Sequence, residues 1–322
     1  MNYELSPETG TPAALAAASP TSKSASTPVP RRVGRFAQTR KTRAMRAVFA
    51  GLCKYAPTVA AHLAFGLLAR PPRPDVRDWH VLLRKRSLHR KLTCGANELS
   101  VYEWGHGPAI LLVHGWGSHA THMGRMVQPL VDAGYRVIAF DAPAHGFSSG
   151  RTTDLVEFAR SIAAVAANAG SLHAIVAHSF GAAMALYAAR DWGVDTRKMV
   201  LISTFEHFNW FLDAFADQVG LSPAVMQRVR DMQVQRYGGR LDWSRMSVVD
   251  MARNAGLELL VIHDQDDKEI PVAHGLAVAG AAPRACFRGT RGLGHQLVVR
   301  NAAVITHVVD FVSGKAQGHA AR

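Results

Sequence analysis

The stretch from His173 to Arg190, "HAIVAHSFGAAMALYAAR", joins a strand-like segment to a helix-like segment through a serine. Its first part is a short apolar run typical of a buried strand, and its last part is an alanine-rich pattern typical of a helix. Ser179 stands between them, with Ala177 and Gly181 two positions away on either side. Such small neighbours leave room for a tight, strained turn that exposes a serine as a nucleophile. A serine at a helix start also caps the helix, so the stretch alone leaves both roles open.

Short apolar runs alternate with helical periodicity from residue 91 onward. They predict eight strands, at 91–94, 98–104, 109–114, 136–140, 173–177, 198–203, 257–263 and 285–289. Helical stretches separate the strands from the third onward, which implies right-handed crossovers. We therefore expect an α/β fold with a mostly parallel eight-stranded sheet and helices on both faces.

The segment at about 205–255 is longer than one crossover helix needs, so it predicts a helical insertion between two strands. Its opening is rich in aromatic side chains: Phe205, Phe208, Trp210, Phe211 and Phe215. One interpretation is a small helical lid whose aromatic side chains line a pocket. The other is that these side chains are ordinary core, and the sequence does not decide between the two.

Four more segments follow expected strands in a fixed order along the chain. They are "HGWG" at 114–117, "FDAPAHGFSSG" at 140–150, "HDQDDKEIP" at 263–271 and "GLGHQLV" at 292–298. Together with the serine turn, they resemble the α/β-hydrolase superfamily over about residues 91–313. The serine then lies in a G-x-S-x-G nucleophile elbow, with Ala177 in place of the first glycine, and "HGWG" is similar to the H-G-x-G oxyanion loop.

The resemblance implies a catalytic triad in the chain order serine, acid, histidine. Ser179 would attack the substrate, and His295 would take its proton as the general base. Alignment of the Ile-Pro pair in the acid loop selects Asp267 as the residue that orients His295. Asp266 is an alternative acid, and Glu206 is another because some family members carry their acid beyond the sixth strand.

The resemblance also implies an oxyanion hole made of two backbone amides, those of Trp116 and Phe180. The side chains of these two residues would shape the pocket. Asp141 and His145 belong to a segment similar to the structural D-x-P-G-H-G-x-S marker of the family, so we expect them to be outside the chemistry.

These residues predict a serine hydrolase, similar to a carboxylesterase or lipase, that cleaves esters of apolar acyl or aryl substrates through an acyl-enzyme intermediate. The same triad also suits a thioesterase, an amidase or a C–C hydrolase, and the same fold can serve as a non-catalytic small-molecule binding protein. The chain has no metal-binding or phosphate-loop motif, so we expect neither a metal nor another cofactor.

The charge of the chain is concentrated at its start. The net charge of +13 equals the excess of Lys and Arg within residues 1–92 alone, whereas the rest is balanced. We expect a disordered basic tail over 1–44, a helical extension over 45–90, and the hydrolase domain over 91–322. Basic residues without interleaved aromatics argue against sequence-specific nucleic-acid binding.

The apolar run at 47–69 is broken by Lys54, Pro57 and His62, which fits poorly with a membrane span or a signal peptide. Two interpretations stay open: a helical hairpin packed on the domain, or an interfacial helix that the basic flank draws to anionic lipid. Three widely spaced cysteines indicate a reducing compartment. We expect a cytoplasmic protein, with peripheral membrane contact through the basic region as the open alternative.

Overall fold

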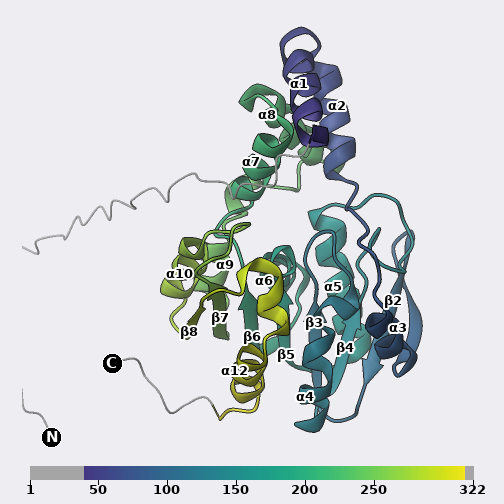
Figure 1. The fold of residues 1–322 in the computed structure, drawn as a ribbon, viewed down its shortest axis with the longest axis vertical. Coiled ribbons are helices and arrows are strands. Elements are labelled where there is room, and N and C mark those ends of the chain that lie inside the picture. The colour runs from purple at the N-terminus through teal and green to yellow at the C-terminus, as the bar shows by residue number, and fades with distance from the viewer. Residues whose placement is uncertain (1–39, 316–322) are drawn as a thin grey trace, which may run out of the picture. The chain divides into compact units, whose positions relative to one another are not determined.

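The computed structural model describes residues 40–315, and they contain an eight-stranded sheet in the order β1-β2-β4-β3-β5-β6-β7-β8 (Figure 1). The strands are β1 (Leu88–Cys94), β2 (Asn97–Trp104), β3 (Ala109–Val113), β4 (Arg136–Phe140), β5 (Leu172–His178), β6 (Thr196–Ile202), β7 (Glu258–Asp264) and β8 (Ala285–Thr290). β1 and β2 join the sheet antiparallel, and every other neighbouring pair is parallel. The expected mostly parallel sheet is confirmed, although β1 begins at Leu88, before the expected range of 91–94.

Helices cover both faces of the sheet because its central strands are apolar on both sides. Their side chains alternate: Leu111 of β3 joins one buried cluster, and Leu112 joins the other. The helices that pack on the first face are α5 (Leu155–Ala169), α6 (Phe180–Trp192), α9 (Val248–Asn254) and α10 (Val272–Ala281). Those on the second face are α4 (Val127–Asp132) and α12 (Ala302–Val312).

The insertion between β6 and β7 contributes α7 (Phe208–Val219) and α8 (Pro223–Arg236) before α9. Both pack against α1 (Arg40–Tyr55) and α2 (Pro57–Leu68) through one buried cluster that includes Phe49, Leu212 and Val225. We call these four helices the cap, and Figure 1 shows them grouped away from the sheet. The apolar helices at the start of the chain thus pack on the insertion rather than on the sheet.

A connecting segment runs from α2 to α3 (Asp78–Lys85) beside the end of β3. At Gly117, where φ is +64°, an added Cβ would lie 2.6 Å from Pro72 Cγ, so the two backbones approach closely there. α3 packs on the short helix η1 (Ala120–Met126), and Trp104 Nε1 donates a hydrogen bond to the Leu83 carbonyl at 3.0 Å. The segment therefore ties the cap to the sheet.

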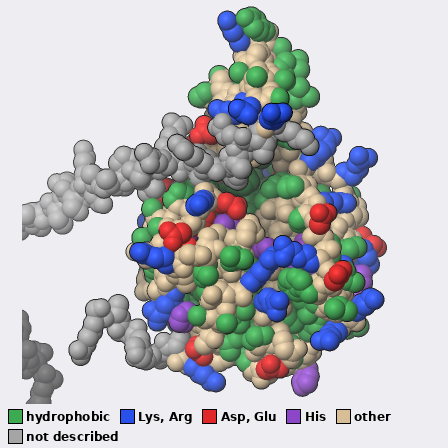
Figure 2. Space-filling view, in the orientation of Figure 1, with side chains coloured by type: hydrophobic (Ala, Val, Ile, Leu, Met, Phe, Trp, Pro, Cys, Tyr) green, Lys and Arg blue, Asp and Glu red, His purple; other side chains and the backbone are tan. Residues whose placement is uncertain are grey.

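None of the helices within residues 40–315 is both long enough and apolar enough to cross a membrane. Figure 2 shows hydrophobic side chains exposed over the helices at the top of the view, among them α1 and α2, with Lys and Arg side chains between them. The tail expected over 1–44 lies almost entirely outside the described residues.

Candidate active site

Ser179 lies on a strained turn between β5 and α6. Its φ is +56° and its ψ is −125°, a conformation that non-glycine residues rarely adopt. Its backbone N–H donates to the Ile202 carbonyl at 2.8 Å. A Cβ at Gly181 would overlap the carbonyl oxygen of His114, which explains why this position of the turn needs glycine. The turn thus holds the hydroxyl at the carboxyl end of the sheet.

The structure brings together three side chains that the sequence analysis selected. His295 Nε2 lies 3.0 Å from Ser179 Oγ, and His295 Nδ1 lies 2.8 Å from Asp267 Oδ2. The other oxygen of Asp267 accepts hydrogen bonds from the amides of Glu269 and Ile270, both at 2.9 Å. Because a carboxylate accepts, Nδ1 of His295 carries the proton and Nε2 is free to accept the serine hydroxyl proton.

The protonation states follow from these contacts. Burial opposes ionisation of Asp267, but hydrogen bonds from His263, His295 and the backbone outweigh burial and hold the pKa of this carboxyl well below its usual value. Burial also lowers the pKa of His295, yet the hydrogen bond and charge of Asp267, with the charge of Glu269, raise the pKa of this ring overall. Asp267 therefore stays ionised beside a basic imidazole.

The alternative acids lie elsewhere. Asp266 is exposed and accepts a hydrogen bond from the Gly292 amide at 2.9 Å. Glu206 Oε1 lies 3.6 Å from His274 Nδ1. Among the three candidate carboxylates, the one that contacts His295 is that of Asp267.

Two buried histidines that sequence reasoning did not single out support this arrangement. His263 Nε2 donates to the Ile270 carbonyl at 2.9 Å and lies 3.5 Å from Asp267 Oδ2. His178, the residue before Ser179, donates from Nε2 to the carbonyl of His295 at 3.0 Å. Both stand at the ends of apolar strands, where an isolated histidine carries no recognisable sequence signal.

Histidines of the strand ends also brace the loop after β3. His114 Nε2 accepts from the Ala142 amide at 3.1 Å, and His145 Nε2 accepts from the Gly117 amide at 3.0 Å. An added Cβ at Gly115 would lie 3.1 Å from Ser179 Cβ, so the loop passes close to the serine. Asp141 binds the Ala120 and Phe147 amides and holds the marker segment in place.

The two residues expected to supply oxyanion donors, Trp116 and Phe180, follow Gly115 and Ser179 in the chain. Phe180 is the first residue of α6, where a backbone N–H has no acceptor within the helix. Trp116 lies in the braced loop, and its ring meets the Phe180 ring edge to face with centroids 5.1 Å apart. Both residues line the same pocket as Ser179 and His295.

The pocket has a volume of about 800 Å³ and lies between the cap and the sheet edge. One wall, which we call the aromatic wall, is formed by Trp116, Phe180, Phe205, Trp210, Phe211 and Phe215. Phe208, like Phe205, is buried in the core, so the aromatic segment contributes side chains both to the core and to the pocket lining. Met45, Leu67 and Leu68 of α1 and α2 complete the lining, a contribution that no sequence pattern indicated.

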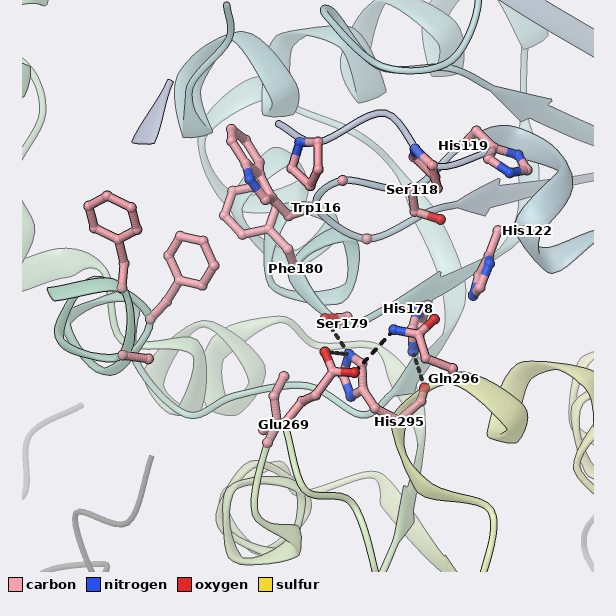
Figure 3. A pocket seen from close by; sticks show the side chains of 18 of the residues that line it. Trp116, Ser118, His119, His122, His178, Ser179, Phe180, Glu269, His295 and Gln296 are labelled. Atoms are coloured by element: carbon pink, nitrogen blue, oxygen red, sulfur yellow. Dashed lines mark hydrogen bonds and ion pairs between the residues drawn. The ribbon is translucent and has the colours of Figure 1, made fainter. Parts of the chain in front are cut away.

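The wall on the other side of Ser179 is polar. In Figure 3, Ser118, His119 and His122 lie to the right of Trp116 and Phe180, and Glu269 and Gln296 lie near His295. Among residues 40–315, no group of three or more His, Cys, Asp or Glu side chains is placed to hold a metal ion.

Comparison with known families adds to this geometry. A family model described as the alpha/beta hydrolase fold matches residues 108–283, which is more than half of the chain. The chain belongs to the α/β hydrolase fold family. The resemblance inferred from the motifs is thereby confirmed.

This α/β hydrolase is similar in sequence to a haloperoxidase and to an esterase. It is 26% identical over 254 residues to a non-heme haloperoxidase of Rhodococcus erythropolis, across 65% of this chain and 93% of that protein. Over 85 residues it is 40% identical to a pimeloyl-(acyl-carrier protein) methyl ester esterase of Xanthomonas campestris pv. campestris, across 26% of this chain and 32% of that protein.

Solved structures share the fold at low sequence identity. A membrane phospholipase A superposes with a TM-score of 0.58 at 17% identity, covering 86% of this chain and 98% of that one. An esterase of Rhodococcus sp. ECU1013 gives a TM-score of 0.54 at 18% identity, covering 71% of this chain and 99% of that one.

Proposed function

We propose that this protein is a serine hydrolase that cleaves carboxylic esters of apolar acyl or aryl groups through an acyl-enzyme intermediate. The observation that carries the proposal is the unbroken hydrogen-bond chain from Ser179 through His295 to Asp267. This chain opens into a pocket with an aromatic wall. Family membership and an ester-cleaving relative support the same reaction class.

In the first step, Ser179 Oγ attacks the ester carbonyl while His295 Nε2 takes the hydroxyl proton. The carboxylate of Asp267 holds the ring through Nδ1–H and stabilises the imidazolium that forms. Because the pKa of Asp267 is held far below its usual value, the proton stays on the imidazole. The result is a tetrahedral intermediate bonded to the serine.

The negative oxygen of that intermediate needs donors at a fixed place. The amides of Trp116 and Phe180 are assigned this role because Phe180 N–H has no acceptor within α6 and the Trp116 loop is braced by His114 and His145. The positive end of the α6 dipole adds to the stabilisation.

The second half of the reaction uses the same groups in reverse. The imidazolium of His295 protonates the departing alkoxide, which leaves an acyl group on Ser179. A water molecule then attacks this acyl group, with His295 as the base that receives its proton. Return of that proton to Ser179 Oγ releases the carboxylic acid.

The aromatic wall accounts for the preference for apolar groups. Phe205, Trp210 and Phe211 lie side by side in the lining, and an acyl chain or aryl ring placed against them leaves water. Each buried methylene contributes about 0.8 kcal/mol, so affinity should rise with chain length until the pocket is full. The α7 part of the insertion serves here as a lid over the pocket.

A burst experiment tests the proposal. With 4-nitrophenyl esters of increasing chain length, the protein should release one equivalent of 4-nitrophenol rapidly and then turn over more slowly, as an acyl-enzyme does when deacylation is slower than acylation. Ser179→Ala should lose both phases. Ser203→Ala is the matched control, because Ser203 is a buried serine with φ +52° at the end of β6. Undiminished hydrolysis by Ser179→Ala would contradict the mechanism, and ester binding without turnover by the native protein would indicate a binding protein.

A further inference from the structure

The polar side of the pocket is built from side chains that the mechanism above does not use. Five of them form what we call the basic wall: Arg77, His80, Ser118, His122 and Arg300. They come from the start of α3, the loop after β3, η1 and the short helix η3 (Val298–Arg300), which are separate in sequence. The convergence of four segments on one side of the pocket needs an explanation beyond the triad.

The proton positions in His122 are fixed by its neighbour. Arg300 Nη2 lies 3.1 Å from His122 Nδ1, and a guanidinium can only donate, so Nδ1 is the acceptor. Burial, with a contribution from Arg300, lowers the pKa of His122 to about 3, and the ring is therefore neutral. Its proton must sit on Nε2, a buried atom without a hydrogen-bond partner among the described residues.

The same reasoning applies to His80. The Arg77 backbone N–H donates to His80 Nδ1 at 3.1 Å, so the proton of this neutral ring also sits on Nε2. Burial, with Arg300 and Arg77 nearby, lowers the pKa of His80 to about 4. Its Nε2 is likewise buried and unpartnered within residues 40–315. Two rings of the basic wall therefore carry N–H donors without acceptors.

Arg300 adds a third unpartnered donor and a positive charge. Its Nε is buried without a hydrogen-bond partner in the described part of the chain. The ion pairs found within residues 40–315 include neither Arg77 nor Arg300. Two carboxylates also line the pocket: exposed Asp75, and Glu269, which lies 3.8 Å from His295 Nε2.

Arg77 and Arg300 carry positive charge that no ion pair found within residues 40–315 neutralises, and an oxygen ligand with negative charge would form charge-assisted hydrogen bonds with these two guanidinium groups. We propose that the basic wall binds an anionic group of the substrate, a carboxylate or a phosphate. The aromatic wall then holds the apolar group on the other side of the scissile bond. This inference rests on the proposed function and narrows its substrate class to esters that carry an anionic group at one end.

Matched substrates test the inference. The octanoate ester of 4-nitrophenol and the 4-nitrophenyl half-ester of suberic acid have the same chain length, but only the second ends in a carboxylate. We expect the native protein to favour the half-ester in kcat/KM. Arg300→Gln should lower the ratio of the two kcat/KM values about tenfold or more, as loss of a charge-assisted hydrogen bond implies.

Arg125→Gln provides the control because Arg125 lies near Arg300 but does not line the pocket. Arg125→Gln should keep the native ratio of the two kcat/KM values, because it removes a charge near the basic wall but no hydrogen-bond donor that lines the pocket. Equal ratios in the native protein, Arg300→Gln and Arg125→Gln would overturn the inference while leaving ester hydrolysis, and hence the proposed function, intact.

A binding measurement separates the two proposals and the two anions. Ser179→Ala protein is titrated by calorimetry with octanoate, octyl phosphate and octanol. If the basic wall binds an anionic group, octanoate or octyl phosphate should bind more tightly than octanol. Adding Arg300→Gln to the Ser179→Ala protein should weaken that binding. The tighter of the two ligands identifies the preferred anion. Equal binding of all three overturns the inference. Because this titration needs no turnover, it tests the wall even if the native protein hydrolyses neither ester.

Discussion

The Asp264 carboxylate accepts a hydrogen bond from the Gly294 amide at 2.9 Å and thereby joins the end of β7 to the loop that carries His295. The Leu293 amide at 3.1 Å and the Thr290 hydroxyl at 2.7 Å bind the same carboxylate, which is fully buried. Two neighbouring aspartates thus have separate tasks: Asp264 fixes the loop backbone, and Asp267 fixes the ring.

Asp264→Asn should therefore reduce both activity and stability. The amide NH2 that replaces one carboxylate oxygen faces N–H donors, so at least one donor loses its acceptor, at a cost of about 1–3 kcal/mol in the free energy of unfolding. Urea unfolding and kcat on an ester substrate measure the two effects. Exposed Asp266 provides the control, and equal losses in Asp266→Asn would contradict the assignment.

Asp267→Asn should lower kcat by about 10⁴, because an amide at this position favours the wrong tautomer of His295. The fold should persist, since Asn can still accept from the Glu269 and Ile270 amides. Steady-state kinetics on a short ester, with circular dichroism to check folding, measures this. A variant that retains the native kcat would exclude Asp267 as the acid.

The pH profile should have one rising limb. Activity requires neutral His295, so kcat/KM should increase as pH rises through the pKa of this ring, with a midpoint above its usual value. Glu269→Gln should move the midpoint to lower pH, because the charge of Glu269 helps to raise the pKa of His295. An unchanged midpoint in this variant would show that the charge of Glu269 does not act on His295.

Gly181→Ala should destabilise the serine turn. The new methyl group would overlap the His114 carbonyl, and overpacking of this kind costs about 1–3 kcal/mol. Gly280→Ala is the matched control, because a Cβ at this exposed helical position meets nothing within 4 Å. The two melting temperatures decide: a drop in Gly181→Ala and none in Gly280→Ala is expected, and equal values would contradict the close packing.

Local sequence patterns were sufficient to predict most of the fold and the three residues at the centre of the site. The central expected strands are short apolar runs, and their parallel order follows from the helices between them, so this part of the sheet could be predicted from sequence. Ser179, Asp267 and His295 each follow a strand, and parallel strands bring their carboxyl ends to one edge. The structure accordingly places the three side chains in contact.

Features that depend on contacts between distant segments left no such signal. The apolar run at 47–69 was compatible with packing on the domain and with an interfacial helix. It did not indicate that α1 and α2 pack on α7 and α8. The basic wall combines Arg77, His122 and Arg300, which lie in segments without a common pattern, and it becomes visible only when hydrogen-bond partners are assigned.

Labelling by a fluorophosphonate, which reacts with activated serines, followed by peptide mass analysis, tests directly whether Ser179 is the nucleophile. We expect one adduct on Ser179, lost in Ser179→Ala and kept in Ser203→Ala. An adduct on another residue, or none on the native protein, would contradict the assignment of Ser179 as the nucleophile.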